Sequence, residues 1–347
     1  MRVGWHRSRI IQVKVVEYMK PSLLSIENLR VSYLLHNAEV RAVDDVSFQI
    51  REGEIVALVG ESGSGKTTTA IAIPRLISPP AKIVGGRIFF KDTELVQAPD
   101  EVIQSIRGKE ISMIFQDPAS FLNPLHKVGN QIREAILLHE VGVTQKEAER
   151  RVIEILNLVR IADPERVYNY YPHQLSGGMS QRAIIAMAIA HYPSLLLADE
   201  PTTALDLTIQ AQILHLLKTL NRELNLAILL ITHDLGCVAG LTDKVIVMYA
   251  GHLVEEGPCL EIFKDPKHPY TKVLLAASSY AGETSTVELI KGSSPDLTNL
   301  PPGCPFHPRC SDARSQCKEQ RPLKTQLTKD RWVTCWEYDN HNNSTAA

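Results

Sequence analysis

Short apolar runs alternate with helix-length segments over residues 23–257, which is typical of an α/β protein built on a sheet. Leu24–Tyr33 and Val43–Ile50 predict an antiparallel pair of strands at the start of the fold. Four later runs are continuously apolar, as expected of strands buried on both faces. These runs are Glu54–Gly60, Ile111–Phe115, Ser194–Ala198 and Leu226–Thr232.

A long, mainly helical stretch, Val128–His191, separates two of these strands. It is too long for a simple crossover helix, so we predict an inserted helical subdomain at about 117–190. Beyond Gly257 a tail rich in proline, cysteine and polar residues replaces the alternating pattern. We therefore predict an N-terminal extension (1–21), a main domain (22–260) and a C-terminal region (261–347).

Composition is that of an ordinary globular protein, with 44% hydrophobic and 22% charged residues and a formal net charge of −2. This balance argues against a nucleic-acid partner, which usually requires a basic domain. No run approaches the roughly 18–20 apolar residues of a membrane span. The first residues lack the apolar core of a secretory signal. We expect them to be a disordered extension or an over-long gene start before Met19, in preference to a membrane-surface arm.

A phosphate-binding loop is predicted at Gly60–Thr67, which reads G-x-x-x-x-G-K-T between a buried strand and a helix-compatible run. Its glycines let backbone N–H groups point at phosphate oxygens. Lys66 is expected to reach the β- and γ-phosphates, and the Thr67 hydroxyl to coordinate Mg²⁺. Pro74 should kink or shorten the helix that follows. The nucleotide-binding residues predicted here are Gly60, Ser62, Gly63, Ser64, Gly65, Lys66, Thr67 and Thr68.

A second anion-binding element is predicted at Leu175-Ser176-Gly177-Gly178-Met179, which is followed by Gln181-Arg182. Exposed serine and glycine residues at a helix N-terminus suit a γ-phosphate.

Polar side chains follow three of the apolar strands. Asp199 and Glu200 end one strand, Gln116 follows another, and His233 ends a third. Neighbouring side chains of a strand point in opposite directions, so the paired carboxylates can have different roles.

Together these segments resemble the ABC transporter ATPase family. The resemblance implies an ABC-type P-loop ATPase fold: a RecA-like mixed-sheet core, an antiparallel β subdomain and an inserted α-helical subdomain. It implies that Asp199 holds Mg²⁺ through water, with Thr67 and Gln116 completing the metal site, and that Glu200 polarises the attacking water. His233 resembles the switch histidine that contacts the γ-phosphate. Asp206 matches the D-loop, and Tyr33 lies where a ring stacks on adenine.

In this family the signature segment of one subunit closes on ATP held by the P-loop of another. Ser176, Gly177 and Gly178 would then act on a partner's nucleotide. The resemblance implies a second ATPase subunit, expected to be a different chain, together with two transmembrane permease subunits and an extracytoplasmic substrate-binding protein. The chain itself would lie peripherally at the cytoplasmic face of the cell membrane.

Four cysteines crowd the C-terminal region with the spacing C-x₅-C-x₆-C-x₁₇-C. They are Cys304, Cys310, Cys317 and Cys335. This spacing is not that of a zinc ribbon, and in a chain without an export signal we favour metal over disulfides. Thiolate ligation points to zinc or an iron–sulfur cluster, with unligated thiols as a third alternative. His307 is expected to be structural rather than a ligand.

The segments Leu300–Cys310 and His268–Thr271 are similar to the C-terminal region of oligopeptide/dipeptide transporter ATPases, as is the variant signature ending in Met179. Some members of that branch bind a [4Fe-4S] cluster through such cysteines, so the resemblance favours a small metal-binding extension that holds such a cluster, with zinc as the alternative. Peptides are the expected cargo, with nickel chelates and oligosaccharides as alternatives. The competing hypotheses are a soluble ABC ATPase acting on DNA or ribosomes, and a regulatory or redox-sensing subunit whose cluster gates the motor.

Overall fold

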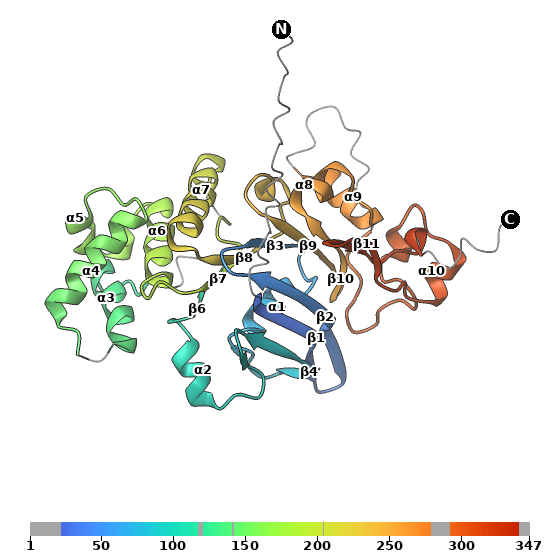
Figure 1. Cartoon of the computed structure of the whole chain (residues 1–347), viewed down its shortest axis with the longest axis horizontal. Coiled ribbons are helices and arrows are strands. Elements are labelled where there is room, and N and C mark those ends of the chain that lie inside the picture. Colours follow the sequence, from blue (N-terminus) through green and yellow to red (C-terminus); the bar gives the residue numbers. More distant parts are fainter. Residues whose placement is uncertain (1–21, 117–120, 141, 204, 279–291, 340–347) are drawn as a thin grey trace, which may run out of the picture.

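The computed structural model describes residues 22–116, 121–140, 142–203, 205–278 and 292–339. The expected N-terminal extension, Met19 and the start of the helical subdomain at residue 117 lie outside this part of the chain. Two sheets carry the fold, and a group of helices extends from one side (Figure 1).

The first sheet is antiparallel and has the strand order β2-β1-β4-β5. Its long hairpin confirms the predicted strand pair, with Leu24 opposite Ile50 and Val31 opposite Val43. Alternate apolar side chains of this hairpin are buried, as the two-residue period of a strand requires. The strands of this sheet are β1 (Ser22–Leu35), β2 (Ala38–Arg51), β4 (Ala81–Phe90) and β5 (Thr93–Glu94).

The second sheet has eight strands in the order β11-β12-β10-β9-β3-β8-β7-β6. The five strands from β9 to β6 are parallel, and β10 and β12 pair antiparallel to their neighbours. The four predicted apolar runs form β3, β6, β7 and β8. The strands of this sheet are β3 (Ile55–Val59), β6 (Ile111–Ile114), β7 (Leu195–Asp199), β8 (Ala227–Thr232), β9 (Lys244–Tyr249), β10 (His252–Pro258), β11 (Thr325–Thr328) and β12 (Arg331–Val333).

Each parallel strand packs its two faces into two different hydrophobic cores. In β7, Leu195 and Leu197 pack into the core shared with the first sheet, whereas Leu196 and Ala198 pack into the core of the helical side. The alternation follows from the strand geometry, and it explains why these runs are apolar throughout.

The predicted helical insertion consists of α3 to α6.

Pro74 was expected to kink or shorten the helix that follows the phosphate-binding loop, and that helix is short. The helix after the phosphate-binding loop ends at Ala72, two residues before that proline, so the interruption takes the form of a short helix. Among the described residues no helix has the length and apolarity needed to cross a membrane. The helices are α1 (Lys66–Ala72), α2 (Asp100–Ile106), α3 (Val128–His139), α4 (Gln145–Leu158), α5 (Pro164–Tyr168), α6 (Gly177–Ala188), α7 (Leu207–Leu224), α8 (Cys259–Lys264), α9 (Pro269–Ala276) and α10 (Ser315–Glu319).

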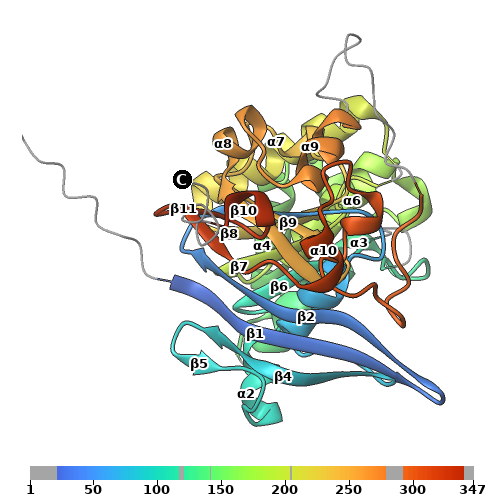
Figure 2. The same cartoon turned by 90° about the vertical axis from the view of Figure 1, so that its right-hand side faces the viewer.

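The C-terminal region continues the second sheet. Strand β12 pairs with β10, placing Val333 opposite Glu255, and β11 pairs with β12. Ile262, Tyr270 and Phe306 share one buried core with β9. Figure 2 shows these segments, in orange and red, packed over the end of the eight-stranded sheet with the first sheet beneath.

Candidate active site

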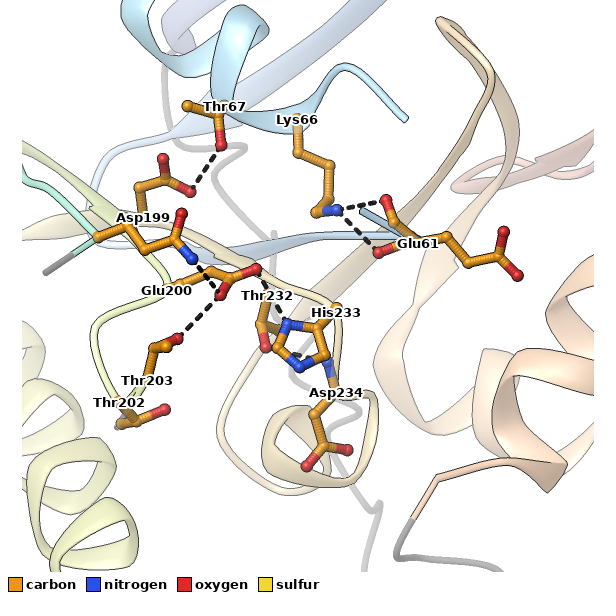
Figure 3. Close-up of polar contacts among 12 residues, drawn as sticks. Glu61, Lys66, Thr67, Asp199, Glu200, Thr202, Thr203, Thr232, His233 and Asp234 are labelled. Carbon is orange, nitrogen blue, oxygen red and sulfur yellow. Dashed lines mark hydrogen bonds and ion pairs between the residues drawn. The ribbon is translucent and has the colours of Figure 1, made fainter. Parts of the chain in front are cut away.

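Four of the predicted catalytic or phosphate-binding side chains follow strands of the parallel sheet at its carboxyl edge. The loop after β3 leads to Lys66, and Gln116, Glu200 and His233 follow β6, β7 and β8. Because parallel strands end at one edge of a sheet, the fold brings these residues together (Figure 3).

The phosphate-binding loop folds closely around its own lysine. Lys66 Nζ donates hydrogen bonds to the backbone oxygens of Gly60 and Glu61, each at 2.8 Å. Gly65 precedes α1 in a left-handed conformation (φ 103°), and a Cβ there would collide with the Ala42 carbonyl oxygen. Burial lowers the pKa of Lys66, although the nearby carboxylates act in the opposite direction.

Thr67 and Asp199 place two oxygen atoms beside each other. The Thr67 hydroxyl donates to Asp199 Oδ1 at 3.2 Å, and Asp199 is only 1% exposed. Burial raises the pKa of this carboxyl, and the Glu200 charge adds to the rise, against the Thr67 hydrogen bond and the Lys66 charge. A hydroxyl and a carboxylate at this separation suit a shared Mg²⁺, which binds oxygen ligands closely.

Glu200 receives three hydrogen bonds. His233 Nδ1 donates to Oε1 at 2.9 Å, and the Thr203 hydroxyl and Gln116 Nε2 donate to Oε2 at 2.8 and 3.1 Å. Burial acts to raise the pKa of this carboxyl, but the bonds from His233 and Thr203 outweigh it, so the pKa lies below its ordinary value. Glu200 therefore stays ionised at neutral pH, as a group that polarises water must.

Tyr33 lies beside the phosphate-binding loop. Its hydroxyl is 3.3 Å from the Thr68 hydroxyl. This position agrees with a site next to the nucleotide, and the predicted stacking on adenine stays a prediction.

The predicted signature segment begins a separate helix. Ser176 caps α6 by accepting a hydrogen bond from the Met179 N–H, and Ser176 and Gly177 are exposed. Asp206 caps α7 in the same way, through the Ile209 N–H. A Cβ at Gly178 would lie 2.9 Å from Ile209, so the two helix starts adjoin each other. Figure 1 shows α6 well to the side of α1, so the structure does not bring the signature segment to this chain's own loop.

Two contributors to the site were not predicted from the sequence. One is Thr203, whose only signal in the sequence is a hydroxyl three residues after Glu200, across a turn. The other is Arg309, whose guanidinium binds Glu61 in the phosphate-binding loop. No local pattern indicates a partner so far along the chain.

The four clustered cysteines line one pocket together with His307. All are free thiols, and burial raises the pKa of Cys304 and of Cys335 to about 11. Within the described ranges, no three His, Cys, Asp or Glu side chains are arranged closely enough to hold a metal ion. The donor set is thus of the right kind for a thiolate-bound metal, whereas the ligating arrangement expected of a metal-binding extension is not present.

Comparison with known proteins places these features in a family. Residues 43–203 match the family described as ABC transporter, and residues 254–317 match the oligopeptide/dipeptide transporter C-terminal region. The oligopeptide transport ATP-binding protein OppD of Bacillus subtilis is 48% identical over 317 residues, covering 90% of this chain and 88% of the relative. The chain belongs to the ABC transporter family.

Other relatives of this ABC transporter chain carry similar descriptions. The dipeptide transport ATP-binding protein DppD of B. subtilis is 47% identical, covering 91% of this chain and 95% of the relative. OppD of Escherichia coli is 43% identical, with coverage of 94% and 96%. These matches confirm the predicted oligopeptide/dipeptide branch. They also confirm the predicted ATPase activity, because ATP hydrolysis is the activity of this family.

Solved structures confirm the fold. The chain superposes on a dimeric post-hydrolysis structure of the ATP-binding cassette MJ0796, bound to ADP and Pi, with a TM-score of 0.61 at 30% identity. The match covers 68% of this chain and 98% of the cassette. The predicted mixed-sheet ATPase core is therefore correct.

Proposed function

We propose that this chain is the ATP-hydrolysing motor subunit of an ABC importer for dipeptides and oligopeptides. The observation that carries the proposal is the meeting of Lys66, Asp199, Glu200 and His233 at one sheet edge, in a chain whose relatives are peptide transport ATP-binding proteins.

Each side chain has a role that its contacts support. Lys66 holds the β- and γ-phosphates once it leaves the loop carbonyls. Thr67, Asp199 and Gln116 hold Mg²⁺, which when bound neutralises charge on the phosphates. Glu200 is ionised and orients water for attack on the γ-phosphate, and His233 is placed to contact the same phosphate.

A partner ATPase subunit completes the site. Ser176 and Gly177 are exposed, and Gly178 half-buried, at the start of a helix remote from the chain's own loop, so these residues would serve the nucleotide of the partner. The dimeric state of the similar cassette supports this arrangement. ATP binding would then close the dimer of ATPase subunits, and hydrolysis would open it again, so each cycle shifts the population between the two states.

Uptake requires further chains, because no described helix can span a membrane. We infer two transmembrane permease subunits and an extracytoplasmic binding protein, with this chain at the cytoplasmic face of the membrane. Within the chain we infer an ATPase domain at 22–260 and a C-terminal region at 261–347.

Reconstitution tests the cargo. The complete transporter, assembled in vesicles with its extracytoplasmic binding protein, should hydrolyse ATP faster when di- or oligopeptides are supplied outside and should accumulate them. Stimulation by a nickel chelate or an oligosaccharide, with no response to peptides, would overturn the peptide assignment and leave the motor role standing.

We further propose that the four-cysteine pocket holds a [4Fe-4S] cluster. Its support is the donor set, since four thiols from separate segments line one pocket. Bound there, the cluster would cross-link segments that carry little other regular structure. Metal binding to thiols of raised pKa must release protons and reorganise the ligands.

Anaerobic purification tests the cluster. Iron, sulfide and visible absorption should appear in the unmodified chain, and Cys304→Ser with Cys335→Ser should lose them and unfold at lower temperature. Matched substitution of Cys237, which lies outside the pocket, should leave the iron content unchanged. A colourless protein that contains zinc would refute the cluster.

A further inference from the structure

The second residue of the phosphate-binding loop is held by side chains of the C-terminal region. The Glu61 carboxylate accepts two parallel hydrogen bonds from Arg309, with Nη1 to Oε2 at 2.8 Å and Nη2 to Oε1 at 2.9 Å. The Ser294 hydroxyl donates to Oε2 at 2.6 Å. The Glu61 N–H donates to the Tyr270 hydroxyl at 2.8 Å. All three partners lie more than 200 residues along the chain, so this contact joins two distant parts of the fold.

The Arg309–Glu61 pair is sheltered from water. The Arg309 side chain is 8% exposed and that of Glu61 is 21% exposed. Arg309 Nη1 also donates to the Tyr249 hydroxyl at 3.3 Å, and the guanidinium lies over the Tyr249 ring. A two-pronged pair with little exposure has a defined geometry, unlike most ion pairs on a protein surface.

The backbone of Glu61 faces the nucleotide site. Its carbonyl oxygen accepts a hydrogen bond from Lys66 Nζ, the group expected to bind the β- and γ-phosphates. Figure 3 shows the Glu61 side chain directed away from Lys66, with its backbone toward the lysine. Glu61 thus carries a negative charge at the edge of a site that must bind a strongly negative ligand. Without Arg309 that charge would be unpaired and free to turn toward the phosphates.

We propose that Arg309 is a positioning residue for the phosphate-binding loop: it neutralises Glu61, holds its carboxylate away from the phosphates and thereby increases the affinity for ATP. The proposal rests on the proposed function, because it assumes that ATP binds at Gly60–Thr67. It extends that function by giving the C-terminal region a direct effect on nucleotide binding. Arg309 also immediately precedes Cys310, so the contact lies next to the cysteine pocket.

Equilibrium binding of MgATP to the purified full-length chain tests the proposal. Arg309→Ala should weaken ATP binding about tenfold, within the range typical of coupling between sites. The double variant Glu61→Gln with Arg309→Ala should recover most of the affinity, because it no longer carries the unpaired charge. Hydrolysis at saturating ATP should change much less than the affinity, since Arg309 does not contact the reacting atoms.

A matched control is available in the helical subdomain. Arg133 donates to the Glu149 carboxylate at 2.7 Å and to the Tyr168 hydroxyl at 3.2 Å. Like Arg309 it therefore binds one glutamate and one tyrosine, but it lies far from the nucleotide site. Arg133→Ala should leave ATP affinity unchanged.

Three results would overturn the proposal: Arg309→Ala binding ATP as tightly as the unmodified chain, the double variant binding as weakly as Arg309→Ala, or Arg133→Ala causing an equal loss. If Arg309→Ala does not fold, Arg309→Lys decides. That variant keeps the charge but loses the two-pronged geometry, so an intermediate affinity supports the proposal and an unchanged affinity contradicts it. Failure of the unmodified chain to bind ATP would instead reject the proposed function.

Discussion

Glu200 has a backbone conformation that is unfavourable for a glutamate, and its carboxylate accepts three hydrogen bonds. Its φ is 46°, in the left-handed region, where a residue other than glycine costs on the order of 1 kcal/mol or more. Hydrogen bonds from its N–H to the Ile231 oxygen and to its carboxylate from His233, Thr203 and Gln116 maintain the conformation. Strain held in place at a strand end is typical of functional residues, and here it aims the carboxylate into the site.

The Thr203 hydrogen bond should affect the pH dependence of ATP hydrolysis. Glu200 must be ionised, its pKa is lowered, and activity is lost as the pH falls through that pKa. Thr203→Val removes a donor that favours the ionised form, so the pKa should rise and the acidic limb of the rate profile should move to higher pH. Rates measured across pH check this shift. The neighbouring Thr202→Val serves as control, and equal profiles for both variants would contradict the role of Thr203.

At the scale of elements, the short loop before α1 is packed against backbone on one side and open on the other. A Cβ at Gly65 would overlap the Ala42 carbonyl, whereas at Gly63 nothing lies within 4 Å. Both glycines have a left-handed backbone, so they share the conformational cost and differ in the collision.

Gly65→Ala should therefore abolish ATP binding, and Gly63→Ala should reduce it by a smaller amount, about tenfold for a strain near 1.4 kcal/mol. Titration with MgATP measures both. Comparable affinities for the two variants would show that the Ala42 contact does not constrain the loop.

A buried ion pair fastens the C-terminal strands to the sheet. Arg331 of β12 binds Glu255 of β10 at 3.0 Å, and their side chains are 5% and 0% exposed. Removing one partner of such a pair leaves a buried charge and costs about 3–5 kcal/mol. Arg331→Ala should lower the free energy of unfolding by that amount in denaturant titration.

The exposed pair of Arg51 and Asp330, in the same neighbourhood, provides the control. Arg51→Ala should cost at most about 1 kcal/mol, because water screens the pair. Equal losses from both arginine variants would mean that the buried pair does not fasten the strands.

Local pattern was sufficient to predict the elements of the ATP site. The runs that became β3, β6, β7 and β8 are continuous because both faces are buried, and Gln116, Glu200 and His233 lie within two residues of a strand end. Strands β4 and β5 were not predicted, because β4 contains glycines and is only partly buried. Strand β12 is three residues long, and its pairing with β10 depends on a contact some 76 residues away in sequence.

At the scale of the whole molecule, the fold separates the two phosphate-binding elements and brings the phosphate-binding loop into contact with the C-terminal region. The signature helix belongs to the helical side, and the phosphate-binding loop belongs to the sheet (Figure 1). Their separation could be predicted only through the family resemblance, since no residue pattern gives the distance between them. The bond between Glu61 and Arg309 could not be predicted at all, because its partners share neither an element nor a sequence motif.

The central claim is that this chain hydrolyses ATP with Glu200 as the group that polarises water. The most direct test is the rate of ATP turnover by the purified transporter complex carrying Glu200→Gln, compared with Glu149→Gln on the surface of the helical subdomain. The account predicts that Glu200→Gln lowers turnover by about 100-fold or more while MgATP still binds, a loss in the range attributed to acid–base catalysis. Glu149→Gln should hydrolyse ATP at the unmodified rate. Turnover by Glu200→Gln equal to that of the unmodified complex would contradict the account.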